Sequence, residues 1–544
     1  MEAVARVLKL EGVQHLFCFP ANPLIEACAA IGIRPILART ERGAINMADG
    51  YARIAGGGAV GVVATQGGPG IENAFGAVAH AYAEGIPVLV LPNAAERRRS
   101  GYHPTFSAVE NYRGVTKWVA EINMARRAPE LMRHAFTYLR SGPPGPVVLE
   151  MPRDVATEEM DEADFDYRPV KGHKASGDPG DVAAAVKALL AAQAPLLHVG
   201  QGVLDAGAWA ELREFAELVH APVMTITTGK SAFPEDHPLA IGNGGATATK
   251  MVDYFLKKSD LIFGVGSTFS TSLVVAPIPR GKAMVQCHAD ERYFNNEYPL
   301  EHAVLGDVRL VLRQLIDEVK RQAGPAGRPG DGGLIEEIKS VKDEWLAEWM
   351  PKLTSDERPI NPYRVIWDLT QTVDRAGTIV IHDSGNPRDQ MTPFYQPTAP
   401  YGYIGWGNST QLGYSLGLAI GAKLAAPEKT VVHVMGDAAI GMTGLDMETA
   451  VRAKTPIVSI VLNNGRMGGY AQHMPEAVRR YGTNLLGGDY VRFAEAMGCH
   501  GERVEDPAQV SPAIRRAVER TREGQPVLLE MMTTEEPAFS RVRR

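Results

Sequence analysis

Two polar residues in the last third of the chain have types and a spacing that could hold a metal ion. Asp437 follows an apolar run, and Asn464 follows another such run 27 residues later. The segment between them, 444–455, has a helix-like pattern, so a strand–helix–strand unit would place both side chains at the carboxyl edge of a parallel sheet. A carboxylate and an amide oxygen are hard ligands that suit Mg²⁺ or Ca²⁺.

The residues after Asp437 are small, which would let a phosphate group approach the backbone. Ala438 and Ala439 stand at the predicted start of a helix, where free N–H groups attract anions. The pattern therefore predicts a diphosphate site bridged by a metal ion. An unrelated strand–helix turn that contains an aspartate is the alternative, because so short a motif has many chance matches.

The strands and helices that could position such a site alternate along the whole chain. Continuous apolar runs predict strands that are buried on both faces, and helical patterns lie between them, as in parallel sheets covered by helices on both sides. The predicted strands are 15–20, 59–66, 86–92, 145–152, 194–202, 221–227, 260–267, 282–290, 378–385, 429–437, 455–465 and 525–532. The expected fold is α/β, with three doubly wound parallel-sheet domains.

Two stretches divide the chain into these domains. Residues 157–181 are polar and acidic, and residues 321–333 are rich in Gly and Pro, which is typical of exposed linkers. The predicted domains are therefore 1–160, 180–322 and 345–544.

The overall composition argues against several classes of function. The 544 residues carry a net charge of −7, which disfavours nucleic-acid binding, and no apolar run approaches the ~20 residues of a membrane span. The four cysteines show no metal-ligand spacing, so a reducing, cytoplasmic setting is expected.

Longer stretches resemble the thiamine diphosphate-dependent enzymes, in particular the acetolactate synthases. Gly-Asp followed by Asn-Asn, which ends here at Asn464, is the defining motif of that family. The motif is usually written with Gly in its third position, where this chain has Ala438. RPILARTERGAINMADGYARIAG (34–56) resembles the segment that carries the family's glutamate, and ATQGGPGIENAFGAVAHAYAEGIPVLVLPN (64–93) and GKSAFPEDHP (229–238) are also similar. The similar stretches cover nearly the whole chain in the right order, which is more specific than any single motif.

The resemblance implies thiamine diphosphate and Mg²⁺ as cofactors. The first domain would bind the pyrimidine ring, and the third would bind the diphosphate. Glu41 would be the catalytic acid that hydrogen-bonds the aminopyrimidine, and an exposed glutamate at a helix N-terminus is the alternative. The implied cofactor contacts are Asn22, Gly385, Asn386, Thr410, Leu412, Gly436, Asp437, Ala438, Ala439, Met442, Asn464 and Met467.

The same resemblance implies roles for particular groups. The metal ligands would be Asp437, Asn464 and the backbone carbonyl of Arg466. The carbonyl of Thr410 would accept from the ring amine, and Leu412 would support the bent cofactor unless it is an ordinary core leucine. The residues implied to line the substrate channel are Gln66, Tyr470 and His473.

The substrate stays open at this point. The leading hypothesis is a carboligase or decarboxylase that acts on a small 2-oxo acid through an enamine/carbanion intermediate, as in acetolactate synthases. The alternative enzyme is a lyase or decarboxylase of a 2-hydroxyacyl-CoA or oxalyl-CoA thioester, because GDAAIGMTGLDMET (436–449) resembles that branch at least as closely. A non-catalytic paralogue or regulatory subunit is a hypothesis of another class.

Three basic residues bear on the choice between these substrates. Arg97, Arg98 and Arg99 follow a predicted strand end, where they could capture a carboxylate or the phosphates of coenzyme A. A solvated charge run is the alternative interpretation of the same triplet.

Two further expectations concern FAD and the assembly. Acetolactate synthases bind FAD in the middle domain, but the matching segments here read GNGGATA (242–248) and STFSTSL (267–273), so FAD is doubtful. Family members build the site across a dimer, with Glu41 from one chain and Asp437 and Asn464 from the other. The expected assembly is a homodimer or a dimer of dimers.

Overall fold

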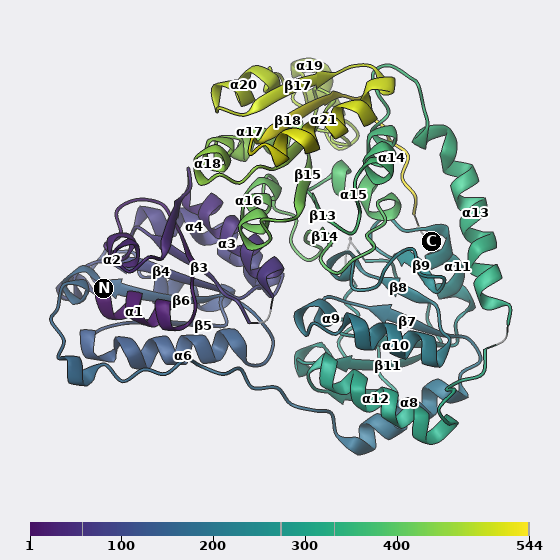
Figure 1. The fold of residues 1–544 in the computed structure, drawn as a ribbon, viewed down its shortest axis with the longest axis horizontal. Helices are drawn as coiled ribbons and strands as arrows, with labels where there is room; N and C mark the ends of the chain where they lie inside the picture. Colours follow the sequence, from purple (N-terminus) through teal and green to yellow (C-terminus); the bar gives the residue numbers. More distant parts are fainter. Residues whose placement is uncertain (57, 272–274, 331, 542–544) are drawn as a thin grey trace.

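Three six-stranded sheets follow one another along the chain in the computed structural model (Figure 1). The structure describes residues 1–56, 58–271, 275–330 and 332–541, so residues 272 and 273 of the 267–273 segment lie outside the described residues. Neighbouring strands within each sheet are parallel, and helices cover both faces, which confirms the predicted α/β class. Within the described part of the chain, no helix is long and apolar enough to cross a membrane.

Each sheet has its own strand order. The first is ordered β2-β1-β3-β4-β6-β5 and comprises β1 (His15–Cys18), β2 (Arg34–Leu37), β3 (Gly61–Thr65), β4 (Val88–Ala94), β5 (Trp118–Glu121) and β6 (Val147–Pro152). The second is ordered β12-β11-β10-β7-β8-β9 and comprises β7 (Pro195–Val199), β8 (Val223–Thr225), β9 (Ala240–Asn243), β10 (Leu261–Val265), β11 (Ala283–His288) and β12 (His302–Leu305). The third is ordered β14-β13-β15-β16-β18-β17 and comprises β13 (Thr378–His382), β14 (Tyr403–Ile404), β15 (Thr430–Gly436), β16 (Val458–Asn463), β17 (His500–Val504) and β18 (Val527–Met532).

The twelve predicted strands are the four inner strands of each sheet, whereas the apolar patterns mark none of the six edge strands. Edge strands contact one neighbour only, so they can be short and partly exposed: β14 has two residues, and every residue of β5 is only partly buried. Such strands lack the continuous apolar run of an inner parallel strand. Only the resemblance indicated β2.

The helices flank these sheets. Those of the first domain are α1 (Glu2–Leu10), α2 (Leu24–Ala30), α3 (Glu41–Ala55), α4 (Pro69–Ala83), α5 (Ala108–Asn111), α6 (Ala128–Arg140) and α7 (Arg153–Ala156). The middle domain has α8 (Pro179–Ala191), α9 (Gly202–Asp205), α10 (Trp209–Val219), α11 (Lys250–Lys258) and α12 (Val308–Ala323). The rest are α13 (Leu334–Leu353), α14 (Pro362–Thr372), α15 (Asn386–Phe394), α16 (Ser415–Ala425), α17 (Asp437–Thr443), α18 (Asp446–Ala453), α19 (Pro475–Tyr481), α20 (Tyr490–Ala496) and α21 (Val510–Arg522).

The first and third sheets share one hydrophobic core. Along β1, Leu16 points into a core of the first domain alone, whereas Phe17 points to the opposite face. That second core also contains Ile381 from β13 and Leu418 from α16, so α3, α4 and α16 lie between the two sheets (Figure 1). The shared core joins the two domains that are expected to bind the cofactor.

Glycines allow α3 and α16 to approach closely. A Cβ atom at Gly50 would lie 2.2 Å from the carbonyl oxygen of Leu418, and one at Gly421 would lie 1.9 Å from that of Met47. Gly417 of α16 lies against Asn46 of α3. Gly421, one turn later in α16, lies against Met47, further along α3, so the two helices run in the same sense. Both helices therefore begin at the same end of the interface.

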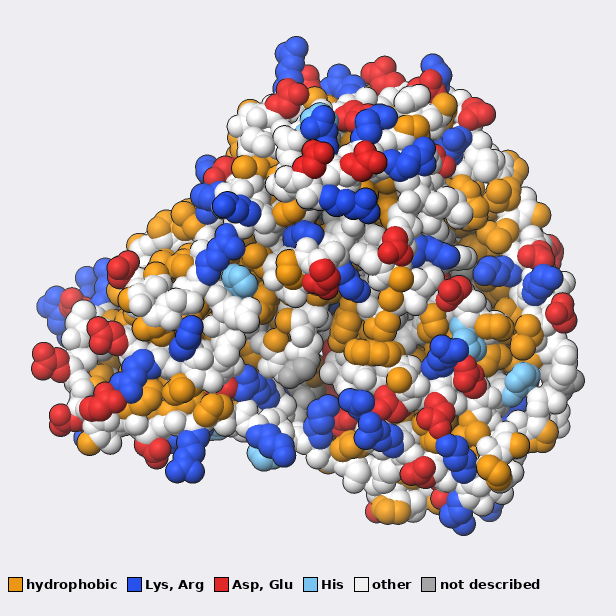
Figure 2. All heavy atoms as spheres, in the orientation of Figure 1, with side chains coloured by type: hydrophobic (Ala, Val, Ile, Leu, Met, Phe, Trp, Pro, Cys, Tyr) orange, Lys and Arg blue, Asp and Glu red, His pale blue; other side chains and the backbone are white. Residues whose placement is uncertain are grey.

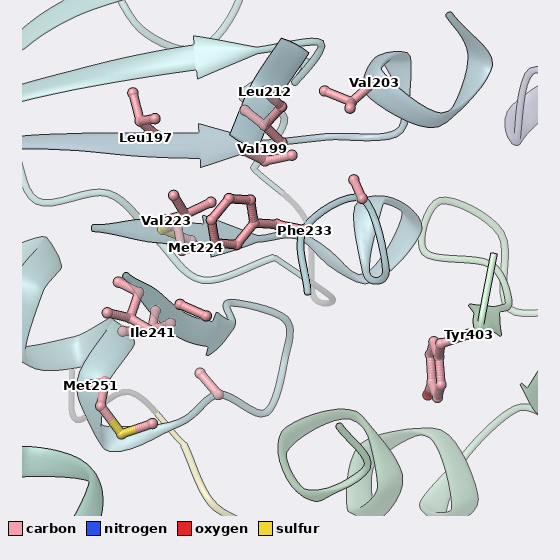
Figure 3. Close-up of a cluster of buried hydrophobic side chains, with 14 of the residues drawn as sticks. Leu197, Val199, Val203, Leu212, Val223, Met224, Phe233, Ile241, Met251 and Tyr403 are labelled. Atoms are coloured by element: carbon pink, nitrogen blue, oxygen red, sulfur yellow. The ribbon is translucent and has the colours of Figure 1, made fainter. Parts of the chain in front are cut away.

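The middle and third domains share another hydrophobic core, which contains residues of both of their sheets. Val223, Met224 and Phe233 lie together in it, and Tyr403 approaches from the third domain (Figure 3). The hydroxyl of Ser231 donates to the backbone carbonyl of Tyr403 (3.0 Å). On the face drawn in Figure 2, acidic and basic side chains are interspersed over all three domains.

The glycine contact between α3 and α16 can be tested by substitution. Gly421→Ala should lower the free energy of unfolding by at least about 2 kcal/mol, because the new methyl group overlaps backbone atoms that cannot move aside. Urea denaturation measures this change. Gly441→Ala is the matched control, since a Cβ atom there meets nothing within 4 Å, and equal stability of the two variants would contradict the contact.

Candidate active site

The side chains of Asp437 and Asn464 converge at the ends of two neighbouring strands. β15 and β16 pair in parallel with Gly436 opposite Leu462, which confirms the expected strand–helix–strand arrangement. The backbone N–H of Arg466 donates to Asp437 Oδ2 (3.2 Å) and to Asn464 Oδ1 (3.0 Å), so both oxygens point to one place. Asp437 is buried, and burial raises the pKa of its carboxyl group, although nearby backbone N–H groups oppose this shift.

A cavity of about 210 Å³ opens beside these oxygens. The predicted residues that line it are Gly385, Asn386, Thr410, Leu412, Gly436, Asp437, Ala438, Ala439, Asn464, Arg466, Met467 and Tyr470. They come from four separate stretches of the third domain, three of which lie at the carboxyl ends of β13, β15 and β16. Their roles in binding a cofactor stay predictions.

One wall of the cavity is the N-terminus of α15. Gly385 precedes the helix with φ +78°, a backbone conformation that favours glycine. Asn386 is the first helical residue, so its N–H has no partner within the helix, whereas Pro387 has no N–H and Asp389 donates to the carbonyl of Gly385 (3.2 Å). Together with the start of α17 at Asp437, this wall is suited to an anion such as a diphosphate.

The turn that carries Thr410 and Leu412 is held by Asp383 at the end of β13. The buried Asp383 carboxylate accepts hydrogen bonds from the N–H of Gly413 (2.9 Å) and the N–H of Ser415 (3.0 Å). Burial raises the pKa of Asp383, and the Gly413 N–H opposes this shift. The carboxylate thus caps the first turn of α16 with an anion, which stabilises a helix N-terminus.

Glu41 is the first residue of α3 and is buried, with 6% of its surface exposed. The side-chain amide of Asn73 donates to Glu41 Oε2 (2.7 Å), and the Thr40 side chain caps the helix by accepting from the N–H of Gly43. The alternative of an exposed glutamate is therefore wrong. Arg42 donates to the carbonyl of Leu412, so the first turn of α3 contacts the wall of the cavity within one chain.

Four other predicted residues do not line the cavity. Asn22 donates from its side-chain amide to the carbonyls of Thr65 (2.9 Å) and Leu91 (2.8 Å), so its amide nitrogen contacts β3 and β4 of its own domain. Gln66 lies beside Gly70 in that domain. Met442 in α17 and His473 in the loop after β16 are exposed.

Several residues that line the cavity were not predicted. Gln390 is on α15, while Thr533, Thr534 and Glu536 belong to the segment after β18. The Glu536 carboxylate accepts from Lys352 Nζ (2.6 Å) and from the side-chain amide of Asn361 (3.0 Å), which fixes this segment against the third domain. Thr533, Thr534 and Glu536 follow the carboxyl end of β18, the strand next to β16, and this position is the signal that could have indicated them.

The basic triplet forms a short 3₁₀ turn, η1 (Arg97–Arg99), with acidic partners. Arg97 Nε donates to Asp154 (2.7 Å), and Arg98 Nε donates to Glu96 (2.6 Å). Both ion pairs are partly exposed. This pairing favours the interpretation as a solvated charge run.

Three parts of the chain match domain models of one known protein family. Residues 1–118 match the N-terminal TPP binding domain of thiamine pyrophosphate enzymes, 182–315 match their central domain, and 383–531 match their C-terminal TPP binding domain. The chain belongs to the thiamine pyrophosphate enzyme family. Thiamine pyrophosphate is another name for thiamine diphosphate, so the protein is a thiamine diphosphate-dependent enzyme, and the hypothesis of a non-catalytic paralogue is not supported.

The chain is similar to curated members of the family over almost its full length. It is 29% identical to the acetolactate synthase isozyme 3 large subunit of Escherichia coli K12, over 97% of this chain and 94% of that protein. It is 27% identical to a probable acetolactate synthase large subunit of Methanococcus aeolicus, over 99% and 93% of the two chains. It is 28% identical to the glyoxylate carboligase of Escherichia coli O157:H7, over 95% and 91% of the two chains.

Because Asp383 caps the turn that carries Thr410 and Leu412, its substitution should weaken cofactor binding. Asp383→Asn should weaken thiamine diphosphate binding by about tenfold, because an amide NH₂ facing the N–H of Gly413 or Ser415 would displace the turn. Isothermal calorimetry with Mg²⁺ measures the change. Ser384→Ala removes only one donor to the Thr410 carbonyl and should have a smaller effect; the reverse ranking would contradict the role of Asp383.

Proposed function

We propose that the protein is a Mg²⁺- and thiamine diphosphate-dependent carboligase or decarboxylase that acts on a small 2-oxo acid. The observation that carries this proposal is the cavity at Asp437 and Asn464 in a chain that belongs to the family. Relatives that cover nearly the whole chain are named as acetolactate synthases and a glyoxylate carboligase. Acetolactate and glyoxylate are both small carboxylic acids.

The donor set of the cavity fits a magnesium ion bound with a diphosphate. Within the described residues, no three His, Cys, Asp or Glu side chains are grouped in a way that could hold a metal ion. In the proposed site, one carboxylate, one amide oxygen and the carbonyl of Arg466 would hold the ion, and phosphate oxygens would complete its shell. Asp437 and Asn464 supply the two side-chain ligands in this proposal.

The chemistry would be divided between the cofactor and the protein. When bound, thiamine diphosphate supplies an electron sink for the bond next to the substrate carbonyl. The protein would orient it, with the Thr410 carbonyl and Leu412 holding the pyrimidine ring and the N-terminus of α15 holding the diphosphate. Asn73 engages Glu41 Oε2, and Oε1 is the oxygen proposed to exchange a proton with the ring.

FAD is proposed to be unnecessary for the reaction.

The proposed assembly is a homodimer or a dimer of dimers. In one chain, the first and third domains are already joined, for example by Arg42 to the Leu412 carbonyl. Mixing an inactive Glu41→Gln variant with an inactive Asp437→Ala variant determines how many chains build each site. Restored activity in the mixture requires two chains, as the resemblance implies.

Two variants should separate cofactor binding from cofactor activation. Asp437→Ala should lose binding of thiamine diphosphate, because it removes the carboxylate ligand of the metal ion. Glu41→Gln should bind the cofactor within about threefold of the wild type yet lose at least about 10²-fold in turnover. Calorimetry and steady-state kinetics measure the two effects, and full activity of Glu41→Gln would refute the proposed role of Glu41.

A substrate screen tests the proposed reaction. The purified enzyme with thiamine diphosphate and Mg²⁺ should turn over pyruvate or glyoxylate, with products followed by mass spectrometry. Oxalyl-CoA and a 2-hydroxyacyl-CoA are the comparison substrates for the thioester alternative. Rapid cleavage of a thioester without turnover of either 2-oxo acid would overturn the proposal.

A further inference from the structure

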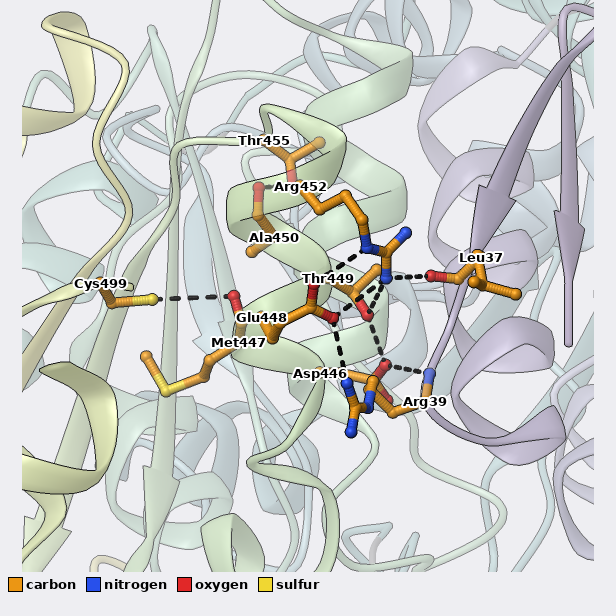
Figure 4. Close-up of polar contacts among 10 residues, drawn as sticks. All are labelled: Leu37, Arg39, Asp446, Met447, Glu448, Thr449, Ala450, Arg452, Thr455 and Cys499. Carbon is orange, nitrogen blue, oxygen red and sulfur yellow. Dashed lines mark hydrogen bonds and ion pairs between the residues drawn. The ribbon is translucent and has the colours of Figure 1, made fainter. Parts of the chain in front are cut away.

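A buried carboxylate on α18 contacts the backbone on both sides of Glu41. Asp446 Oδ1 accepts from the backbone N–H of Arg39 (2.8 Å) and from the Thr449 hydroxyl (3.0 Å) (Figure 4). Asp446 Oδ2 lies against Gly43, where an added Cβ atom would be 2.3 Å away. Asp446 is 2% exposed.

Other contacts fasten the same segment to α18. Arg452 donates to the carbonyl of Leu37 (2.6 Å), and Arg39 forms an ion pair with Glu448 (3.5 Å) (Figure 4). These pairs are partly exposed, so they contribute little individually. The contact of Asp446 with Arg39 and Gly43 differs from them because it is buried and lies two residues to either side of Glu41.

We propose that Asp446 is a positioning residue that sets the location of Glu41 relative to the cofactor. This inference rests on the proposed function of Glu41. Asp446 is not among the residues that line the cavity, so it acts through the backbone of residues 39–43. α18 belongs to the third domain of the same chain, so Asp446 fixes the Glu41 segment of the first domain against the third domain.

The size of the effect follows from the demands of proton transfer. A general acid must stay within hydrogen-bond reach of its partner atom, and a displacement of about 1 Å can cost about 10²-fold in rate. Loss of the Asp446 carboxylate leaves the Arg39 N–H without its acceptor and leaves a gap beside Gly43. The first turn of α3 can then shift, while the oxygens of Asp437 and Asn464 are unchanged.

The test uses a signal that needs no knowledge of the substrate. The thiazolium proton of bound thiamine diphosphate exchanges with deuterium oxide at a rate that depends on Glu41 in the proposed mechanism. Asp446→Ala should slow this exchange by about ten- to a hundredfold, while calorimetry with Mg²⁺ shows a cofactor Kd within about threefold of the wild type. Asp446→Asn keeps the Oδ1 acceptor and should recover most of the exchange rate.

A second route reaches the same contact from the other side. Gly43→Ala should also slow exchange, because its methyl group meets Asp446 Oδ2, and it should add little in an Asp446→Ala background, where the clash is gone. If thermal unfolding shows that Asp446→Ala does not fold, Asp446→Ser takes its place in both measurements.

Three results would overturn the inference. The first is an exchange rate equal to the wild type in a folded Asp446→Ala variant. The second is a loss of cofactor affinity in that variant that parallels the loss of exchange rate. The third is that the Gly43→Ala and Asp446→Ala substitutions have additive effects on the exchange rate. Glu41→Gln is the reference for slow exchange. If the wild-type protein itself fails to bind thiamine diphosphate, or if Glu41→Gln exchanges at the wild-type rate, the proposed function fails rather than the role of Asp446.

Discussion

The packing of α3 on α16 is the contact on which the rest of the structure depends. These helices belong to different domains, yet they share one core with both sheets. Gly50 and Gly421 let their backbones touch, and the helices run in the same sense. The N-terminus of α3, at Glu41, therefore lies at the same end of the interface as the turn that precedes α16. Any side chain that separated the helices would displace the first domain from the third domain of the same chain.

Buried carboxylates that accept from backbone N–H groups fix the geometry around this interface. Asp383 holds the turn before α16, and Asp446 holds the segment before α3. Glu84, at the end of α4, accepts from the N–H groups of residues 407, 408 and 409, which lie just before the same turn. Hydrogen bonds to a charged acceptor are stronger than neutral ones, so these loops, which lack regular secondary structure, are held at specific points.

The metal end of the site has a simpler origin. Asp437 and Asn464 are placed by the pairing of two inner strands, so the Arg466 N–H reaches Asn464 within the local turn and Asp437 at the end of the neighbouring strand. The pyrimidine end needs contacts between domains, such as Arg42 with the Leu412 carbonyl. The two ends thus depend on different levels of structure, and substitutions at Asp437 and at Asp446 are expected to affect different properties.

The sequence by itself determined the α/β class, the inner strands and the Asp437–Asn464 pair, because inner strands are continuous apolar runs and strand ends meet at one edge. It did not determine the edge strands, which are short or partly exposed and lack a continuous apolar run. The position of the Thr533–Glu536 segment against the cavity, the alignment of Asp446 with Glu41, and the use of the Asn22 amide within its own domain were decided by tertiary structure. These depend on how helices and segments distant in sequence pack, and spacing along the chain does not encode such packing.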